Sequence, residues 1–241
     1  MKNNYPKWSF ISANLAKSLI AVTLMVALIA IPTAASAQGV LIDHTCTDIT
    51  AIPSSWISSA KSNLKIAYGH TSHGSQITSG MDAIESYYTS GLYDWSNTGG
   101  SGELHLFEGD GYGTGWLNHD CGYPGWDGLT RDYLDSFPSC NVIMWSWCSQ
   151  VDDVNLQTHY FTPMAQLEND YPNVKFVYMT GHLEGLGPAG SLHNANEQIR
   201  NYCATNNRVL FDFADIESYS PDGDTNFMQY FATDECYYYH P

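Results

Sequence analysis

Residues 64–76 read LKIAYGHTSHGSQ, and this stretch decides the fold. Its first five residues form a short apolar run, and a segment with helical spacing begins at Gln76. A strand that turns through glycine into a helix is where α/β enzymes place a nucleophile. The turn holds two histidines and three hydroxyls, whereas Gly, Asn or Asp would close it more simply. We therefore expect function at residues 69–76.

Outward from this stretch, short apolar runs alternate with longer segments of helical spacing. The runs expected to be strands are 64–68, 103–107, 141–147, 174–179 and 208–213. The segments expected to be helices are 76–88, 129–137, 155–171 and 192–206. Glycine-rich residues 99–115 are expected to form a long loop. Strands that alternate with helices are typical of an α/β fold whose parallel sheet is covered on both faces.

The first 37 residues have the pattern of a secretory signal peptide. Lys2, Lys7 and Lys17 precede the apolar stretch 19–31, which leads to the small residues 35–37. Cleavage is expected before Gln38, which predicts a secreted or periplasmic protein with a single domain at residues 38–241. The alternative is a retained anchor, but the apolar core is shorter than the ~20 residues that a membrane span needs. We expect no membrane association after cleavage.

Charge limits the partners of the mature chain. Cleavage removes three of the nine basic residues, so the remaining 241 − 37 = 204 residues carry 6 − 25 = −19 charges. Phosphate binding needs a basic surface, so nucleic acid is excluded as an expected partner. The sequence does not indicate an oligomeric state.

The six cysteines of the mature part favour disulfides in an exported chain. The six cysteines allow three bridges, and fifteen pairings are consistent with the sequence. Cys148 is the exception, because its position after the apolar run 141–147 allows a functional or a packing role.

In an open parallel sheet, ligands bind beyond the carboxyl ends of the strands. Residues that follow the expected strands are therefore site candidates, and they are Ser72, the Gly125 region, residues 148–150, His182, Asp212 and Asp215. A serine needs a base within ~2.6 to 3.2 Å and donors aimed at the developing oxyanion. His182 is one candidate base because it follows a strand, and His240 is the other.

The layout resembles the SGNH, or GDSL-like, hydrolase superfamily. Gly69 to Ser72 is similar to its nucleophile turn, with Ser75 as the second choice, and residues 122–130 are similar to the block that donates an oxyanion-binding glycine. The resemblance implies a three-layer α/β/α sandwich with a mainly parallel, flavodoxin-like sheet. It also implies ester hydrolysis without a cofactor or metal, on a small-molecule or polysaccharide substrate.

The resemblance assigns a role to each block of the family. Ser72 is the nucleophile, Gly125 the oxyanion glycine, with Gly128 as second choice, and Gln150 or Ser149 replaces the usual asparagine donor. Asp234 and the terminal His240 are similar to the last block, but their spacing differs. The family continues with a helix after this histidine, which predicts either a chain that is truncated at its C-terminus or a base elsewhere in the sequence.

Two other classes of function fit the same sequence. A metal-dependent hydrolase would use His70, His73 and His182 with a carboxylate such as Asp212, because neighbouring histidines can share a metal. A noncatalytic carbohydrate-binding protein would use exposed tryptophans in polar loops. Those tryptophans are Trp95, Trp116 and Trp126, whereas Trp145 and Trp147 are expected in the core. Both readings remain open at this point.

Overall fold

The computed structural model describes residues 39–109 and 115–234. Its strands are β1 (Leu41–Ile42), β2 (Lys65–Gly69), β3 (Trp95–Ser96), β4 (Leu104–Glu108), β5 (Val142–Trp145), β6 (Lys175–Met179) and β7 (Val209–Phe211). Its main helices are α2 (Ser54–Asn63), α3 (Ser75–Tyr87), α4 (Trp126–Ser136), α5 (Thr162–Asp170), α6 (Ser191–Asn206) and α7 (Phe213–Ser218). The predicted signal peptide lies outside the described residues and stays a prediction.

The strands form one seven-stranded sheet in the order β1-β7-β6-β5-β2-β4-β3, and every pairing is parallel. Its central strands β4-β2-β5-β6-β7 follow the flavodoxin-like order 2-1-3-4-5. The short strands β1 and β3 extend the sheet at its two edges. The predicted α/β fold with a parallel, flavodoxin-like sheet is confirmed.

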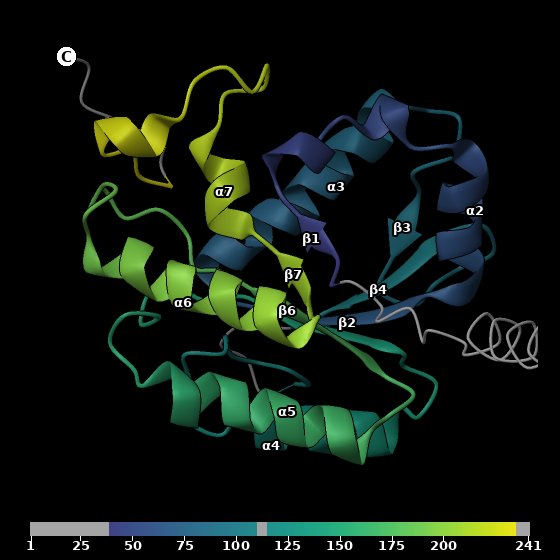
Figure 1. The fold of residues 1–241 in the computed structure, drawn as a ribbon. Helices are drawn as coiled ribbons and strands as arrows, with labels where there is room; N and C mark the ends of the chain where they lie inside the picture. Colours follow the sequence, from purple (N-terminus) through teal and green to yellow (C-terminus); the bar gives the residue numbers. More distant parts are fainter. Residues whose placement is uncertain (1–38, 110–114, 235–241) are drawn as a thin grey trace, which may run out of the picture. The chain divides into compact units, whose positions relative to one another are not determined.

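Helices pack on both faces of this sheet, with α2, α3 and α7 on one side and α4 and α5 on the other (Figure 1). On the α4 and α5 face, which α6 also covers, the core contains Trp126, Met164 and Ile199. On the opposite face Met81 and Phe213 pack against the sheet. The arrangement is therefore a three-layer sandwich with an apolar core on each side.

The central strands alternate their side chains between these two cores. Ile143 and Trp145 of β5 join the core beneath α4 to α6, whereas Met144 faces the other core. Tyr178 and Met179 of β6 divide in the same way. A strand buried on both faces has no polar side, which explains why these segments are continuous apolar runs in the sequence.

Several elements differ from the sequence-based expectation. The structure adds β1, β3, α2 and α7, because two-residue strands and short helices carry too little periodicity to be recognised. None of the residues of α2 is buried, so this helix lacks the apolar stripe that would have predicted it. The strand expected at 103–107 is present as β4, which interrupts the expected loop 99–115, and residues 110–114 lie outside the described residues. The expected helix 155–171 contains a π-helical turn, Gln157–Phe161, before α5.

The expectation that the cysteines form disulfides was wrong for the described residues. Cys46, Cys121, Cys140, Cys148 and Cys203 are free thiols, and Cys236 lies outside the described residues. Cys121, Cys140 and Cys203 are buried within the apolar core beneath α4 to α6. They act there as small apolar side chains.

No helix in the part of the chain that the structure describes is both long enough and apolar enough to cross a bilayer.

Gly69 is the last residue of β2 and directly precedes the turn with the candidate site residues. It pairs with Trp145 in the parallel register, and a Cβ atom on Gly69 would lie 2.2 Å from the Trp145 ring. The ring is completely buried and donates a hydrogen bond to Thr130 over 2.9 Å. The tryptophan therefore requires glycine in the neighbouring strand.

We expect Gly69→Ala to lower the free energy of unfolding by about 1–3 kcal/mol, because the added methyl group overpacks the core. Urea denaturation measures this change. The matched control is Gly80→Ala in α3, where no atom lies within 4 Å of the new Cβ. The control should gain about 0.5–1 kcal/mol from its lower chain entropy. Equal midpoints for the two variants would contradict the close packing at Gly69.

Candidate active site

The candidate site lies at the carboxyl edge of the sheet, where β2 and β5 are neighbours. β2 pairs with β4 on one side and with β5 on the other, so the connections leave in opposite directions. Open α/β sheets bind ligands at such a switch point. The turn after β2 carries Ser72 and His73, and the turn after β5 carries Cys148. The fold therefore places these two turns side by side at the edge of the sheet.

Three features constrain the backbone conformation of the turn after β2. A Cβ atom on Gly74 would lie 2.3 Å from His70 Cβ, so this position also requires glycine. The Tyr68 hydroxyl donates to the Gly74 carbonyl over 3.0 Å. Ser72 has φ of 28°, a value that residues other than glycine seldom adopt. These constraints fix the direction in which the next residue, His73, leaves the backbone.

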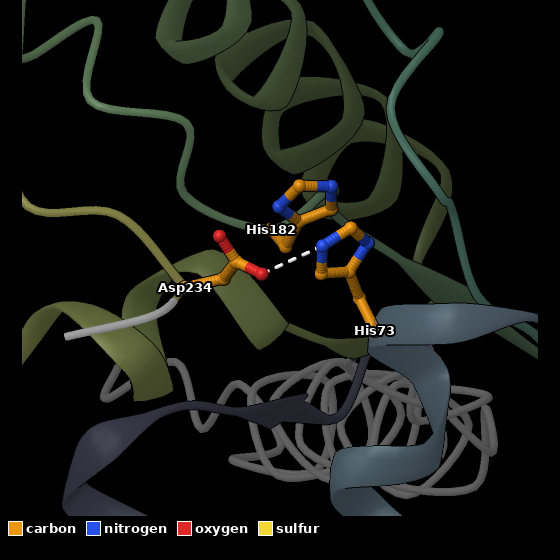
Figure 2. A group of neighbouring side chains, drawn as sticks. All are labelled: His73, His182 and Asp234. Carbon is orange, nitrogen blue, oxygen red and sulfur yellow. Dashed lines mark ion pairs between the residues drawn. The ribbon is translucent and has the colours of Figure 1, made fainter.

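His73 lies between a thiol and a carboxylate. Its Nδ1 is 3.5 Å from Cys148 Sγ, and its Nε2 is 2.6 Å from Asp234 Oδ2, the pair that Figure 2 shows with a dashed line. Because an ionised carboxylate only accepts hydrogen bonds, Nε2 carries the proton and Nδ1 offers its lone pair to the thiol. A nucleophile, a base and a group that orients the base are the parts of a catalytic triad.

His182 packs face to face on His73, with ring centroids 3.7 Å apart and planes inclined by 21°. Its Nε2 accepts the Ser149 N–H over 3.1 Å, and its Nδ1 donates to the Leu183 carbonyl over 3.1 Å. Both contacts require the neutral ring with its proton on Nδ1. Burial lowers the pKa of His182, and the neighbouring His73 lowers it further, whereas the Leu183 carbonyl acts in the opposite direction. His182 is therefore a neutral partner of the base.

The same two histidines and Asp234 form a group at this edge of the sheet that could bind a metal ion. One atom each from His73, His182 and Asp234 lies within 4.8 Å of the other two. A tetrahedral zinc site needs lone pairs that converge on one point. Here the rings are stacked, and the two Nε2 atoms are engaged by Asp234 and by the Ser149 N–H. This geometry fits proton transfer better than a closed coordination sphere.

A second group, Asp43, His44 and Asp215, lies near the start of α7. His44 contacts the Asp215 carboxylate twice, through Nδ1 at 2.5 Å and through its backbone N–H at 2.9 Å. The His44 ring also stacks on Tyr219 at a centroid distance of 3.5 Å. These contacts join the segment after β1 to α7, and this role accounts for the group.

Ser72 and His182 both reach the candidate site, but in different surroundings. Ser72 is exposed, and among the described residues no hydrogen bond joins its hydroxyl to a histidine. The second choice, Ser75, donates its hydroxyl to the Ser72 carbonyl over 2.7 Å. The alternative base, His240, lies outside the described residues. The serine mechanism therefore stays a prediction.

The predicted oxyanion donors lie on two segments, Gly125 before α4 and Gln150 after β5. Gly125 is exposed and precedes α4 with φ of 96°. Gln150 follows Cys148 by two residues, and its Oε1 would be 2.4 Å from a Cβ atom on Gly122. Gln150 thus lies against the loop before α4. Their roles as donors stay predictions.

The metal-binding set expected from the sequence does not assemble as expected. Only His73 and His182 meet, because His70 Nε2 lies 3.0 Å from Glu108 and Asp212 pairs with Arg200 at 2.6 Å. His70 turns its ring to Tyr68 instead, since the two rings stack at 4.7 Å. The carboxylate beside the two histidines is Asp234.

The tryptophans also differ in part from the expectation. Trp145 and Trp147 are buried, as expected, but so is Trp126, which donates to the His159 carbonyl over 3.1 Å. Trp116 is partly exposed, yet it packs edge-on against Tyr133 and Phe137. The prediction that Trp126 is an exposed sugar-stacking residue is therefore wrong, because helix α4 places its side chain in the core.

Cys148 and Asp234 are the two residues that the sequence did not connect with His73. The signal for Cys148 was its place after a buried strand, next to the strand that precedes His73. The signal for Asp234 was its similarity to the last SGNH block, which did not indicate a partner 234 − 73 = 161 positions earlier. Only the folded chain places this carboxylate against the base.

Comparison with family models, with curated proteins and with solved structures found no match for the chain. The structure shows the α/β fold with its parallel sheet, and the resemblance to SGNH hydrolases stays a prediction.

We expect His182 to make the protein less stable in acid. An unfolded histidine titrates near its ordinary pKa of 6.5, whereas burial lowers the pKa of the folded His182. Below pH 6.5 the unfolded chain therefore binds a proton at His182 more readily than the folded protein does. The free energy of unfolding decreases as the pH falls from 6.5 toward the lower pKa of the folded His182. His182→Gln should reduce the slope of the unfolding free energy between pH 7 and 5. His193→Gln in α6 is the control, and equal slopes in all three proteins would refute this role.

Proposed function

We propose that the protein is a hydrolase that cleaves ester bonds with the thiolate of Cys148. One observation carries this proposal: His73 lies with Nδ1 3.5 Å from Cys148 Sγ and with Nε2 2.6 Å from Asp234 Oδ2. A thiol is inert until it loses its proton, and a histidine that is oriented by a carboxylate is a suitable base. The substrate class is a small-molecule or polysaccharide ester.

In the first half of the reaction, His73 Nδ1 takes the Cys148 proton and Sγ attacks the ester carbonyl carbon. The resulting imidazolium is stabilised by the Asp234 carboxylate. The tetrahedral intermediate collapses, the carbon–oxygen bond breaks, and His73 returns the proton to the leaving alcohol. The acyl group is then a thioester on Cys148.

In the second half, His73 removes a proton from a water molecule that attacks the thioester carbon. The carbon–sulfur bond breaks, the carboxylic acid leaves, and the thiol regains its proton from His73. Neutral His182 supports the base in both halves, because its ring covers one face of His73 without adding a charge. Gln150 and Gly125 are the proposed oxyanion donors.

The backbone after Cys148 supports a nucleophilic role for this residue. Ser149 and Gln150 have φ of 61° and 60°, so two successive residues adopt the left-handed conformation. Such strain costs of order 1–3 kcal/mol per residue and is concentrated at functional sites. The turn leaves the thiol partly exposed at the sheet edge, where a substrate can reach it.

We expect Cys148→Ala to lower kcat/KM for small acyl esters on the order of a thousandfold, because the acyl acceptor is removed. Ser72→Ala should retain activity within about threefold, since its own hydroxyl has no role in this mechanism. Hydrolysis of p-nitrophenyl acetate measures both. Cys46→Ser, at an exposed free cysteine, is the matched thiol control.

The opposite pattern, loss in Ser72→Ala and retention in Cys148→Ala, would favour the serine mechanism instead. Treatment with o-phenanthroline should leave the rate unchanged. A rate that falls with the chelator and returns with zinc would replace the thiol mechanism by a metal-dependent one.

The charges around the site restrict the substrate. Asp234 and Glu184 lie beside the histidine pair, with Glu184 Oε1 3.5 Å from His182 Nε2. Lys65 and Lys175 begin their strands, and so lie at the opposite edge of the sheet. The other basic residues of the mature chain are Lys61, Arg131, Arg200 and Arg208, which contact carbonyls or carboxylates elsewhere. The site therefore repels anionic substrates.

We expect a positively charged acyl ester to have a kcat/KM about tenfold higher than an anionic ester of the same size. Two like charges about 8 Å apart repel by ~2 kcal/mol at an effective dielectric constant of 20, before screening. Added salt should reduce the difference. Competition between two such esters at 20 and 500 mM NaCl measures it. A preference for the anion at either salt concentration would contradict the proposed selectivity.

A further inference from the structure

The backbone of Leu183 connects the second histidine to the triad carboxylate. Its carbonyl accepts two hydrogen bonds, one from His182 Nδ1 and one from the Asp234 N–H, each over 3.1 Å. Its N–H, in the preceding peptide unit, donates to Glu217 Oε2 over 2.8 Å. A shift of the backbone at Leu183 would therefore move His182 and Asp234 together.

The segment that carries Asp234 is attached to the loop after β6. Glu184 and Thr233 form an isolated antiparallel bridge, which consists of the Asp234 N–H contact above and of a hydrogen bond from the Gly185 N–H to the Ala232 carbonyl over 3.1 Å. Both hydrogen bonds join the segment to that loop. The position of the carboxylate that orients His73 thus depends on the position of that loop.

Glu217 fixes the loop from the opposite side. It lies on α7, a helix that packs through Ala214 against Leu183 and Ala232. Its carboxyl group faces the Leu183 N–H, Gln76 of α3 and Asp234, and none of these is a cation. Burial is the largest cause that raises the pKa of Glu217, the Leu183 N–H opposes the rise and Asp234 adds to it, with a net pKa of about 7. A carboxyl group that bears this cost at the site is a candidate for function.

We propose that Glu217 is a positioning residue, which sets the distance between His73 and Cys148 by holding the backbone of Leu183. The effect is transmitted from Glu217 to Leu183, from there to Asp234 and His182, and finally to the His73 ring. The inference rests on the proposed thiol mechanism. The proposed role depends on the length of the Glu217 side chain, whereas the charge of its carboxyl group is secondary.

Two substitutions separate reach from charge. Glu217→Gln keeps the length and an acceptor oxygen, and at pH 6 it matches the neutral carboxyl group. We expect its kcat to stay within about threefold of the wild type at that pH. Glu217→Asp keeps the carboxyl group but withdraws it by about 1.5 Å, the length of one carbon–carbon bond. We expect its kcat to fall about tenfold or more with KM little changed, because misplacing catalytic groups by about 1 Å is costly.

Asp215→Asn is the control on the same helix, since Asp215 contacts His44 and not the site. It should retain the wild-type kcat. Urea midpoints establish that each variant is folded. A folded Gln variant with a tenfold loss, or an Asp variant with the wild-type kcat, would overturn the proposal. If the Asp variant does not fold, the Gln variant alone decides.

Alkylation by iodoacetamide tests the inference without any turnover. The rate at Cys148, measured by peptide mass spectrometry relative to exposed Cys46, reports how well His73 activates the thiol. This ratio should fall in Glu217→Asp and stay unchanged in Glu217→Gln. If Cys148→Ala retains esterase activity, the proposed function fails, whereas this ratio still accepts or rejects the role of Glu217.

Discussion

The parallel pairing of β2 with β5 is the constraint on which the rest of the site depends. Gly69 is in register with Trp145, and the bulky ring fits only because its neighbour has no side chain. This register ends the two strands side by side, so their turns leave the sheet at the same level. His73 and Cys148, which are 75 residues apart in the chain, therefore meet. A slip of this pairing would separate them and would expose the tryptophan.

The electrostatic state of the site follows from burial and from the direction of a few hydrogen bonds. Two stacked histidines would repel each other if both were charged. His182 avoids this by accepting the Ser149 N–H and by being buried, which lowers its pKa. The proton taken from Cys148 then goes to His73, where Asp234 stabilises it. Because His182 stays neutral, His73 alone carries the proton in the proposed mechanism.

The sequence predicted the fold well because the central strands are buried on both faces. Such strands are continuous apolar runs, and the glycine turn and the long helices between them were equally visible. The edge strands and α2 were missed because their side chains are partly solvated. The histidines after β2 and β6 were recognised as site residues for the same reason as the strands, since they directly follow them. Cys148 was noticed but given no role, because a sequence does not tell which of two neighbouring turns faces a thiol.

Asp234 marks the limit of prediction from sequence, and it also links folding to activity. The proposed triad takes one residue from the turn after β2, one from the turn after β5 and one from the segment near the end of the described chain. The pairing of the central strands brings the first two together. The third is held by contacts with the loop after β6, which in turn rests on α7 beyond β7. The orientation of the proposed base therefore depends on the packing of α7. The proposed activation of the thiol accordingly requires both the centre of the sheet and the helix that follows its last central strand.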